Sequence, residues 1–349
     1  MRFAIVVFIA VVNLGFVGCG VKDELPAETP AAAATTAVIA PLPKLDLRHD
    51  TSLEAQIAEI AAQSQGRVGV SAVLLETGDA AELNGDEQFP MQSVYKLPIA
   101  MAVLYASSVG KLSLNQQISV RPADFVRLGV RSPIRNEFPK GAVFTIRELL
   151  AQAISESDGT ANDILLEQAG GPAGVMDYLQ KLGVGDMYVK DSEKDIFKDW
   201  DTQYRNSATP RATVELLRAL NFAAGIAADP REELVYLMKT SSSGGRRLKK
   251  LLPKDVEVAH KTGTGGTEPV DTPAANSATN TPRVKSSPTP TGSPQIISSS
   301  TNDVGIIYLP NGKHILIAVY VSDSTAPAFI REGTIAQIAK AVWDRWGGE

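Results

Sequence analysis

The sequence predicts an α/β domain built on an antiparallel sheet flanked by terminal helices, with an all-α domain inserted into it. Segments with strand periodicity occur near the two ends of the expected folded part, and a long helical stretch separates them. The chain has 349 residues, 44% of them apolar, which is enough for a core of that size. We expect residues 46–90 and 208–346 in the α/β domain and residues 91–207 in the helical domain.

The first part of the α/β domain is expected to be one helix followed by two strands. Residues 51–64 place apolar side chains on one helical face, and Thr51 with Glu54 has the spacing of a capping box. Residues 67–76 alternate and are rich in β-branched side chains, which is typical of a strand. A second short strand fits residues 81–84.

Helix starts recur through the middle of the chain. Thr145 with Glu148, and Thr160 with Asp163, also have capping-box spacing, and Gly170-Gly171 is typical of a helix end. Further helices are expected at 93–107, 172–182, 210–224, 231–239 and 328–346, and strands at 256–263, 303–309 and 314–322, with a tight turn at Pro310-Asn311-Gly312.

The N-terminus has the pattern of an export signal. Arg2 precedes ten apolar residues from Phe3 to Val12, a run too short to span a bilayer comfortably. A small residue directly before Cys19 resembles a bacterial lipobox, so residues 1–19 are interpreted as a signal peptide with Cys19 as its lipidation site. The protein would then be exported to the periplasm or cell envelope, with a lipid as its only membrane contact. Residues 20–45, rich in Pro and Ala, would form a disordered tether.

A second segment of low complexity interrupts the late strands. Residues 267–300 consist mainly of Pro, Thr, Ser, Asn and Ala and include six prolines. Such a composition buries too little apolar surface to fold by itself. We therefore expect residues 267–300 to be a disordered insertion within a β-hairpin.

Charge and composition exclude several classes of protein. The 34 basic and 39 acidic residues give a net charge of −5, which argues against a nucleic-acid-binding protein. A single cysteine permits no disulfide within the chain. The three histidines, His49, His260 and His314, lie far apart and lack the spacing of zinc ligands. No metal and no cofactor are expected.

Three short motifs carry the candidate chemistry. In the first, Ser93-Val94-Tyr95-Lys96, positions i and i+3 share a helical face, so the lysine amine can reach the serine hydroxyl and activate it. The second, Ser157-Asp158-Gly159, lies in a turn between two expected helices. The third, Lys261 to Gly265, places a lysine and hydroxyls on one strand, where they suit a carboxylate ligand, and its glycines permit close backbone approach.

In this order, S-x-x-K, S-D-x and K-T-G resemble the penicillin-recognising serine enzymes, and class A serine β-lactamases in particular. The resemblance covers residues 51–346 and includes FPMQSVYKLPIAMAVL (89–104), RSPIRNEFPKGAVFTIRELL (131–150), RRLKKLLP (246–253) and VAHKTGTGG (258–266). The segment around Ser93 is most similar to the branch that contains PER-type and Bacteroides-type cephalosporinases. The resemblance implies the β-lactamase/D,D-peptidase-like fold and a monomer that hydrolyses small β-lactam substrates.

The resemblance also implies a role for each motif residue. The implied catalytic residues are Ser93 as nucleophile, Lys96 or Glu193 acting through water as the base of acylation, Ser157 as proton relay and Glu193 as the base of deacylation. The implied substrate-binding residues are Lys261, Thr262, Thr264 and Gly159, and the implied oxyanion hole is made by the backbone N–H groups of Ser93 and Thr264. Glu193 is assigned from its spacing to the stretch 203–206, with Asp191, Asp195 and Asp199 as competitors.

Three features depart from the pattern of the family. The second motif usually ends in Asn, where this chain has Gly159, and four residues after the loop glutamate Asn is usual, where this chain has Phe197. The insertion at 267–300 is the third. Two alternatives therefore remain beside a β-lactamase. One is a D,D-peptidase acting on cell-wall peptides, and the other is a non-hydrolytic lipoprotein sensor that stays acylated.

Overall fold

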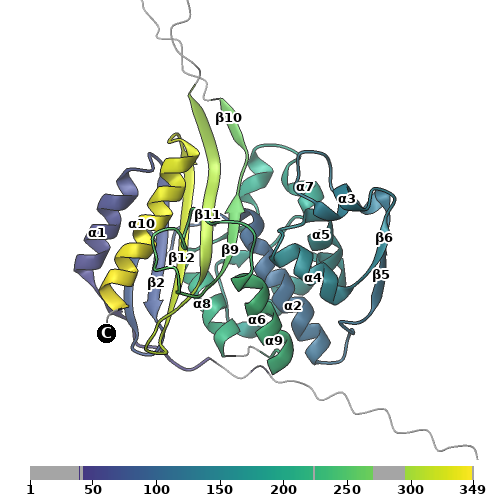
Figure 1. The fold of residues 1–349 in the computed structure, drawn as a ribbon, viewed down its shortest axis with the longest axis horizontal. Coiled ribbons are helices and arrows are strands. Elements are labelled where there is room, and N and C mark those ends of the chain that lie inside the picture. The colour runs from purple at the N-terminus through teal and green to yellow at the C-terminus, as the bar shows by residue number, and fades with distance from the viewer. Residues whose placement is uncertain (1–38, 40–41, 223–224, 270–294, 348–349) are drawn as a thin grey trace, which may run out of the picture. The chain divides into compact units, whose positions relative to one another are not determined.

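A mostly antiparallel sheet runs through the structure, a computed structural model that describes residues 39, 42–222, 225–269 and 295–347 (Figure 1). Its strands follow the order β1-β3-β2-β12-β11-β10, and β9 also pairs with β11. Strand β2, near the N-terminus, pairs with β12, near the C-terminus, so both ends of the chain share one sheet, as the sequence predicts. The bounds are β1 (Arg48–His49), β2 (Arg67–Leu74), β3 (Asp79–Leu83), β9 (Val258–Thr264), β10 (Thr267–Pro269), β11 (Ile296–Tyr308) and β12 (His314–Ser324).

Strand β12 shows how alternation builds two layers of core. Successive side chains of a strand point to opposite faces of the sheet. The residues Ile315, Ile317, Val319 and Val321 join the core under the terminal helices, whereas Leu316, Ala318 and Tyr320 join the core on the helical side. All of them are buried, so the sheet is covered on both faces along this strand.

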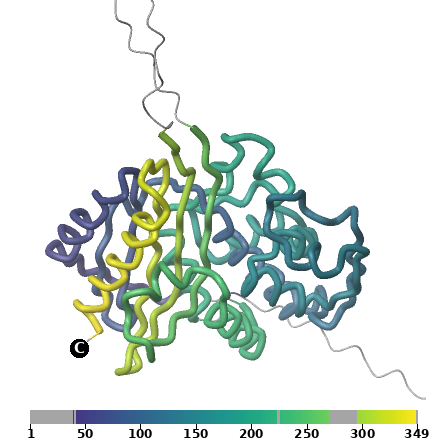
Figure 2. Tube along the Cα trace, turned by 45° about the horizontal axis from the view of Figure 1, so that its top comes forward, coloured from purple at the N-terminus to yellow at the C-terminus, as the bar shows by residue number. Residues whose placement is uncertain are grey.

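The two terminal helices lie side by side on one face of the sheet (Figures 1 and 2). They are α1 (Thr51–Ala62) and α10 (Ala328–Trp346). Leu53 and Ile57 of α1 and Ile335 and Val342 of α10 are buried in the same cluster. The expected sheet with terminal helices packed on it is confirmed, and the structure adds that both helices lie on the same face.

The opposite face carries the helical part of the chain (Figure 1). Helix α2 lies at its centre, and its residues Lys96 to Leu104 are all buried. Helix α8 packs on the sheet, and α9 packs against both β9 and α4. The helices are η1 (Gln92–Tyr95), α2 (Lys96–Ser108), η2 (Pro122–Asp124), α3 (Pro133–Glu137), α4 (Ile146–Ile154), α5 (Gly159–Gln168), α6 (Gly171–Leu182), α7 (Glu193–Ile196), η3 (Asp201–Tyr204), α8 (Pro210–Asn221) and α9 (Ala228–Lys239).

Short elements connect the helices and were not predicted from the sequence. The small strands are β4 (Phe89–Pro90), β5 (Gln117–Val120), β6 (Ala142–Thr145), β7 (Met187–Tyr188) and β8 (Ser207–Ala208). Strands β4, β8 and β7 form a second sheet, and β5 pairs with β6. Strands of two to four residues are too short to show a periodic pattern. The described residues belong to one compact unit, and the boundaries of the two domains remain a prediction.

Two of the three expected capping boxes are wrong. The box of Thr145 and Glu148 is confirmed at the start of α4. Helix α1 is instead capped by Asp50, whose carboxylate accepts a hydrogen bond from the backbone N–H of Leu53 at 3.0 Å. Sequence spacing alone cannot decide between neighbouring polar residues, because each can satisfy the free N–H groups of a helix start.

The second wrong box concerns α5. This helix is capped by Asp158, which accepts from the N–H of Ala161 at 2.9 Å. Thr160 and Asp163 instead serve tertiary contacts: the hydroxyl of Thr160 accepts from the N–H of Val126, and Asp163 holds the start of α7. Similarly, the expected helix at 93–107 begins with the separate 3-10 turn η1 before α2.

The insertion predicted at 267–300 is wrong at both ends, because strands occupy its first and its last residues. Residues Thr267–Pro269 form β10, and β11 already begins at Ile296, with Pro269 opposite Ile296 in the register. Ser298, Ser299 and the residues after them are buried. The strand expected at 303–309 is therefore seven residues longer at its start. Residues 270–294 lie outside the described residues.

We expect a chain in which Asn-Gly replaces residues 270–295 to fold and to keep its turnover. Pro269 and Ile296 are paired neighbours, so a two-residue turn can join them. Shortening the connection between two paired strands adds stability slowly, about 0.6 kcal/mol for each halving of its length. Thermal unfolding should therefore show an unchanged or higher Tm. A lower Tm would mean that the replaced segment contributes to folding. Deleting 268–299, almost all of the segment suggested by composition, would remove the start of β11 and should destabilise the sheet.

The expected tether at 20–45 is also too long. Leu42 and Leu45 pack against the main core, and the carbonyl of Pro43 accepts a hydrogen bond from Arg218 at 2.6 Å. Apolar side chains that reach a core order the backbone next to them. The proposed signal peptide at 1–19 and the rest of the tether apart from Ile39 lie outside the described residues. Within the described ranges, no helix combines the length and the apolar character needed to span a membrane.

Candidate active site

Ser93 and Lys96 are brought together by the turn η1 and the first residue of α2. The Nζ atom of Lys96 lies 3.1 Å from the Oγ atom of Ser93, within hydrogen-bonding distance. Lys96 is only 2% exposed, whereas Ser93 is partly accessible. The predicted contact of the first motif is confirmed, although its two residues belong to consecutive helical turns of different type.

Glu193 provides the counter-charge of Lys96. Its Oε1 atom lies 2.8 Å from the Nζ atom of Lys96, and both side chains are buried. A buried ion pair keeps its geometry only when further hydrogen bonds support it. Lys96 also donates to the backbone carbonyl of Ser157 at 2.8 Å. The amine is therefore fixed between the hydroxyl of Ser93 and the carboxylate of Glu193.

Ser157 lies between the two buried lysines. Its backbone has a positive φ of 57°, a left-handed conformation uncommon for a residue other than glycine. Its Oγ atom accepts a hydrogen bond from the Nζ atom of Lys261 at 2.9 Å and lies 3.4 Å from that of Lys96. Burial lowers the pKa of Lys261 well below its usual value, and the nearby charge of Lys96 lowers it further. The hydroxyl of Ser157 thus lies between the amines of two buried lysines.

The third motif forms β9, which pairs with β11. Lys261 is fully buried in this strand with its amine on Ser157, whereas Thr262 and Thr264 line the cavity. The Oγ1 atom of Thr262 lies 2.8 Å from the Oγ atom of Ser243, and that of Thr264 accepts from Arg247 at 2.7 Å. The strand thus presents a row of hydroxyl groups to the cavity.

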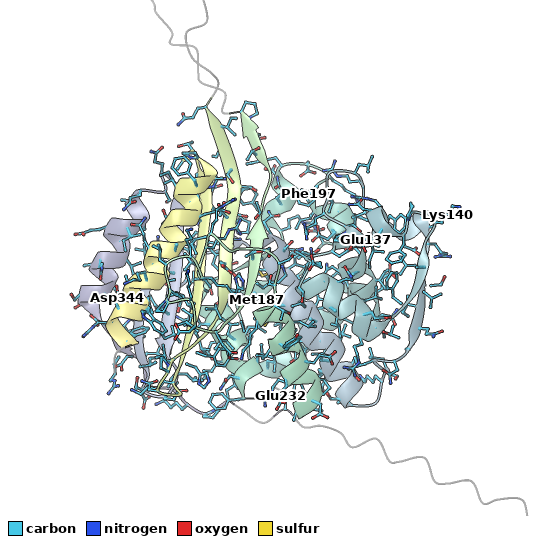
Figure 3. The ribbon with its side chains drawn as sticks, in the orientation of Figure 1. Glu137, Lys140, Met187, Phe197, Glu232 and Asp344 are labelled. Atoms are coloured by element: carbon cyan, nitrogen blue, oxygen red, sulfur yellow. The ribbon has the colours of Figure 1, made fainter. Side chains whose placement is uncertain are left out.

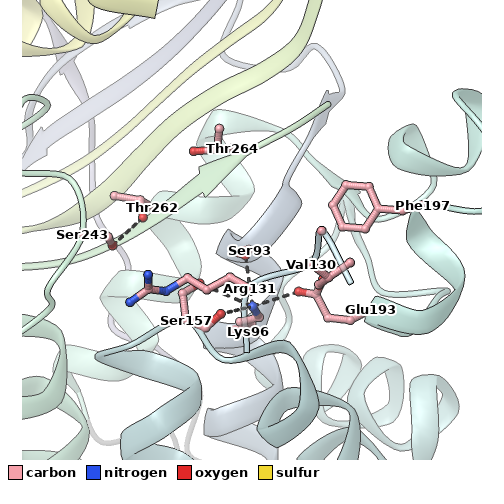
Figure 4. A pocket seen from close by; sticks show the side chains of 11 residues that line it. Ser93, Lys96, Val130, Arg131, Ser157, Glu193, Phe197, Ser243, Thr262 and Thr264 are labelled. Carbon is pink, nitrogen blue, oxygen red and sulfur yellow. Dashed lines mark hydrogen bonds and ion pairs between the residues drawn. The ribbon is translucent and has the colours of Figure 1, made fainter. Parts of the chain in front are cut away.

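These side chains surround a cavity of about 250 Å³ (Figure 4). Figure 4 shows Ser93 and Lys96 at its base, Ser157 beside them, Glu193 and Phe197 on one side, and Thr262 with Ser243 on the other. The lining residues are Ser93, Lys96, Gly129, Val130, Arg131, Ser157, Glu193, Phe197, Ser243, Thr262 and Thr264. Among the described residues, no group of three or more His, Cys, Asp or Glu side chains gathers in a way that could hold a metal ion.

Asp163 fixes the position of Glu193. Its carboxylate accepts hydrogen bonds from the backbone N–H groups of Glu193 at 2.6 Å and of Lys194 at 3.1 Å. Burial is the main cause that raises the pKa of Asp163 to about 7, and the charge of Glu193 acts in the same direction. This contact from α5 replaces the helix cap expected from the sequence.

Of the four candidate carboxylates on this loop, only Glu193 lines the cavity. Asp195 accepts from Ser192 and pairs with Lys198, away from the site. Asp199 accepts from the backbone and hydroxyl of Thr202, and Asp191 pairs with Arg205. The geometry therefore favours Glu193 over its three competitors.

Gly159 and Phe197, the two positions where this chain departs from the family pattern, lie differently relative to the cavity. Gly159 starts α5, and its N–H donates to the carbonyl of Arg131 at 2.9 Å. A Cβ atom there would lie 3.2 Å from the Cγ1 atom of Val130 and 3.4 Å from the Cγ atom of Glu193, two residues that line the cavity. Gly159 is not itself among the lining residues, and its role in binding stays a prediction. Phe197 does line it, beside the strands β9 and β10 in Figure 3.

Four lining residues were missed as site residues from the sequence. They are Gly129, Val130, Arg131 and Ser243. Arg131 belongs to a segment that carries the family resemblance, and that segment was the one signal available for it. Ser243 lies in a run of serines before Gly244-Gly245 and has no pattern of its own. Loop residues reach a cavity through tertiary folding, which periodicity does not report.

Comparison with known proteins agrees with this geometry. Residues 52–346 match the family model described as the β-lactamase enzyme family. The chain belongs to this family. It is 36% identical over 295 residues to the β-lactamase VEB-1 of Pseudomonas aeruginosa, covering 84% of this chain and 90% of that protein. It is 33% identical to the extended-spectrum β-lactamase PER-1 of the same organism, covering 83% and 86%.

A solved structure extends the similarity to the fold. A class A β-lactamase from Bacteroides cellulosilyticus has a TM-score of 0.72 and 30% identity, covering 86% of this chain and 98% of that one. The predicted class A fold, with a mostly antiparallel sheet and a helical part, is confirmed. The chain is a class A serine β-lactamase, and its activity is the hydrolysis of β-lactams.

Proposed function

We propose that Ser93 is the nucleophile of this β-lactamase and that Lys96 activates it. The contact of 3.1 Å between Ser93 Oγ and Lys96 Nζ, continued to Glu193 at 2.8 Å, is the observation that supports this assignment most strongly. Attack on the lactam carbonyl forms an ester with Ser93 and breaks the C–N bond of the ring. Lys96 receives the serine proton after passing one of its own protons to Glu193, or Glu193 receives the serine proton through a water molecule.

Ser157 passes a proton to the lactam nitrogen as the ring opens. Its hydroxyl contacts the amine of Lys261 at 2.9 Å and lies 3.4 Å from the amine of Lys96. After Ser157 gives its proton to the lactam nitrogen, either amine can therefore supply a new proton to its hydroxyl. The depressed pKa of Lys261 favours this transfer, because its neutral and charged forms lie closer in free energy than in water.

The strand β9 and the turn η1 hold the substrate. The backbone N–H groups of Ser93 and Thr264 form the oxyanion hole, since both residues line the cavity. The hydroxyls of Thr262 and Thr264, with the charge of Lys261 behind them, bind the substrate carboxylate. Gly159 takes part only through its backbone, since it has no side chain.

Glu193 acts again in the second half of the reaction. As general base it removes a proton from the water that attacks the acyl-enzyme. The ester of Ser93 is cleaved, the water oxygen joins the carbonyl carbon and Ser93 recovers its proton. Phe197, an apolar ring, cannot hold this water by a hydrogen bond, so polar groups around Glu193 must do so.

A chromogenic cephalosporin tests this assignment against both alternatives. Sustained turnover that is lost in Ser93→Ala supports the proposal. Negligible turnover together with cleavage of D-Ala-D-Ala peptides would indicate a D,D-peptidase. A single stoichiometric burst without turnover would indicate a sensor that remains acylated. The presence of Glu193 in the cavity favours hydrolysis, because a carboxylate there can activate water.

We further propose that the enzyme is exported as a monomer and anchored in the cell envelope through a lipid on Cys19. The single cysteine of the chain, seven residues after the apolar export run and directly after the small residue Gly18, supports this proposal. We expect Cys19→Ser to keep its β-lactamase activity but to leave the membrane fraction. The measurement is activity in membrane and soluble fractions, with mass spectrometry of the N-terminal peptide. A wild-type enzyme found soluble and without lipid would overturn the anchor.

A further inference from the structure

Gln203 joins the loop of Glu193 to the hairpin at the end of β9. It lies in η3 and is 4% exposed. Its Oε1 atom accepts two hydrogen bonds, from the backbone N–H of Gly266 at 2.7 Å and from the hydroxyl of Ser299 at 3.1 Å. Gly266 lies between β9 and β10, and Ser299 belongs to β11. One buried amide oxygen therefore binds both the connection between β9 and β10 and the strand β11.

The backbone of Gln203 binds the turn of the nucleophile. Its carbonyl accepts from the Nε2 atom of Gln92 at 3.3 Å, and Gln92 directly precedes Ser93. Gln92 is 1% exposed and has a positive φ of 49°, so its side chain has little freedom. Gln203 is thus in contact with the Ser93 turn through its backbone and with the hairpin through its side chain.

The fit between Gln203 and the hairpin is close. A Cβ atom placed on Gly266 would lie 2.9 Å from the Oε1 atom of Gln203, nearer than real Cβ contacts allow. Gly266 also accepts from the backbone N–H of Ser299 at 3.0 Å, so it cannot withdraw without breaking the hairpin. The absence of a side chain at Gly266 is what lets the amide of Gln203 reach the backbone.

We propose that Gln203 is a positioning residue that sets the distance between Glu193 and the Thr264 end of β9. Glu193 lies ten residues before Gln203 on the same loop, and Thr264 lies two residues before Gly266. The proposal rests on the proposed function, in which Glu193 activates the deacylating water and Thr264 stabilises the oxyanion. Both groups must be held within about 0.5 Å of their working geometry.

Removal of the amide should slow deacylation more than acylation. In Gln203→Ala the backbone contact with Gln92 remains, so the Ser93 turn keeps its support. The loop of Glu193 loses its contact with the hairpin, and a misplacement of about 1 Å can cost 10²-fold in rate. We expect kcat for a chromogenic cephalosporin to fall roughly 10- to 100-fold. A rapid-mixing experiment should then show a stoichiometric burst that the wild type lacks.

Two matched variants separate positioning from general destabilisation. Gln203→Glu keeps an oxygen that can accept from Gly266 and Ser299, so it should restore most of kcat. Thr202→Val removes a hydrogen bond of the neighbouring residue within the loop itself, to Asp199, and should leave the burst absent. Unfolding temperatures of all variants show whether lost stability explains any change.

Gly266→Ala tests the same contact from the other side. The added methyl group would displace the amide of Gln203, so this variant should show the same burst as Gln203→Ala. The double variant should be no slower than Gln203→Ala alone, because the shorter side chain leaves room for the methyl group. Strict additivity of the two losses would overturn the proposal, since independent sites add.

The remaining outcomes are also decisive. If Gln203→Ala keeps the wild-type kcat and shows no burst, Gln203 does not position the loop, while the proposed function stands. If kcat falls without a burst and Gln203→Glu fails to restore it, the residue supports folding only. A wild type without turnover would instead contradict the proposed function. The turnover of the wild type is therefore measured before any variant is compared with it.

Discussion

Glu193→Gln is expected to convert the enzyme into one that forms its acyl-enzyme and then stops. The carboxylate lies 2.8 Å from Lys96 and lines the cavity, where it can take a proton from water. The amide of glutamine cannot act as a base, although its oxygen can still accept from Lys96. General-base catalysis typically contributes about 10²- to 10⁴-fold, so turnover should fall by at least that order. Mass spectrometry should detect the substrate bound covalently to Ser93.

Ser93→Ala is the control for this experiment and should form no adduct. The unfolding temperature of Glu193→Gln should be measured in parallel, because this substitution removes one charge of the buried ion pair with Lys96. Hydrolysis at the wild-type rate in Glu193→Gln would mean that another group activates the water. Asp191 and Asp195 would then be examined, although their carboxylates face Arg205 and Lys198 and do not line the cavity.

The catalytic motifs could be predicted from sequence because their contacts are local or carried by regular elements. Ser93 and Lys96 are one helical turn apart in the sequence, so their side chains meet. Lys261 and Thr262 are neighbours on the strand β9, whose periodicity the sequence shows. Strand periodicity near both ends of the chain predicted that these segments share one sheet, and the pairing of β2 with β12 agrees with this. Such features depend on neighbours in the sequence or on long alternating segments.

Residues whose partners are distant in sequence could not be predicted in the same way. Asp163 was expected to cap its own helix, yet it binds the N–H groups of Glu193 and Lys194, thirty and thirty-one residues away. The sequence assigned no contact to Gln203, which only helped to locate Glu193 by spacing. Its contact with Ser299 spans 96 positions. A polar side chain takes whichever buried donor the fold brings near, because leaving that donor unpaired costs free energy.

The predicted ends of the insertion, 267 and 300, were wrong for a related reason. Residues 267–300 are mainly Pro, Thr, Ser, Asn and Ala, yet Ser299 is buried in β11. Hydroxyl side chains can be buried where strand partners and nearby acceptors satisfy them, as the amide of Gln203 does for Ser299. Low complexity therefore indicates the presence of an insertion more reliably than its ends.

Lys96→Met is expected to lose acylation, the step that Glu193→Gln preserves. The amine lies 3.1 Å from Ser93 Oγ, and methionine has a similar length without a group that can accept or supply a proton. We expect the rate of acyl-enzyme formation to fall by about 10²- to 10⁴-fold. Single-turnover kinetics with a chromogenic cephalosporin would measure that rate directly. Acylation at the wild-type rate would show that Glu193, acting through water, is the base for Ser93.

Stability provides an independent measurement on the same pair. Lys96→Met leaves the carboxylate of Glu193 buried without its partner, and breaking a buried pair from one side typically costs about 3–5 kcal/mol. Adding Glu193→Gln removes the unpaired charge, so the double variant should be more stable than Lys96→Met alone while remaining inactive. Chemical denaturation of both variants would measure this difference. If the double variant is no more stable than Lys96→Met, the two side chains do not form the buried ion pair on which the proposed mechanism depends.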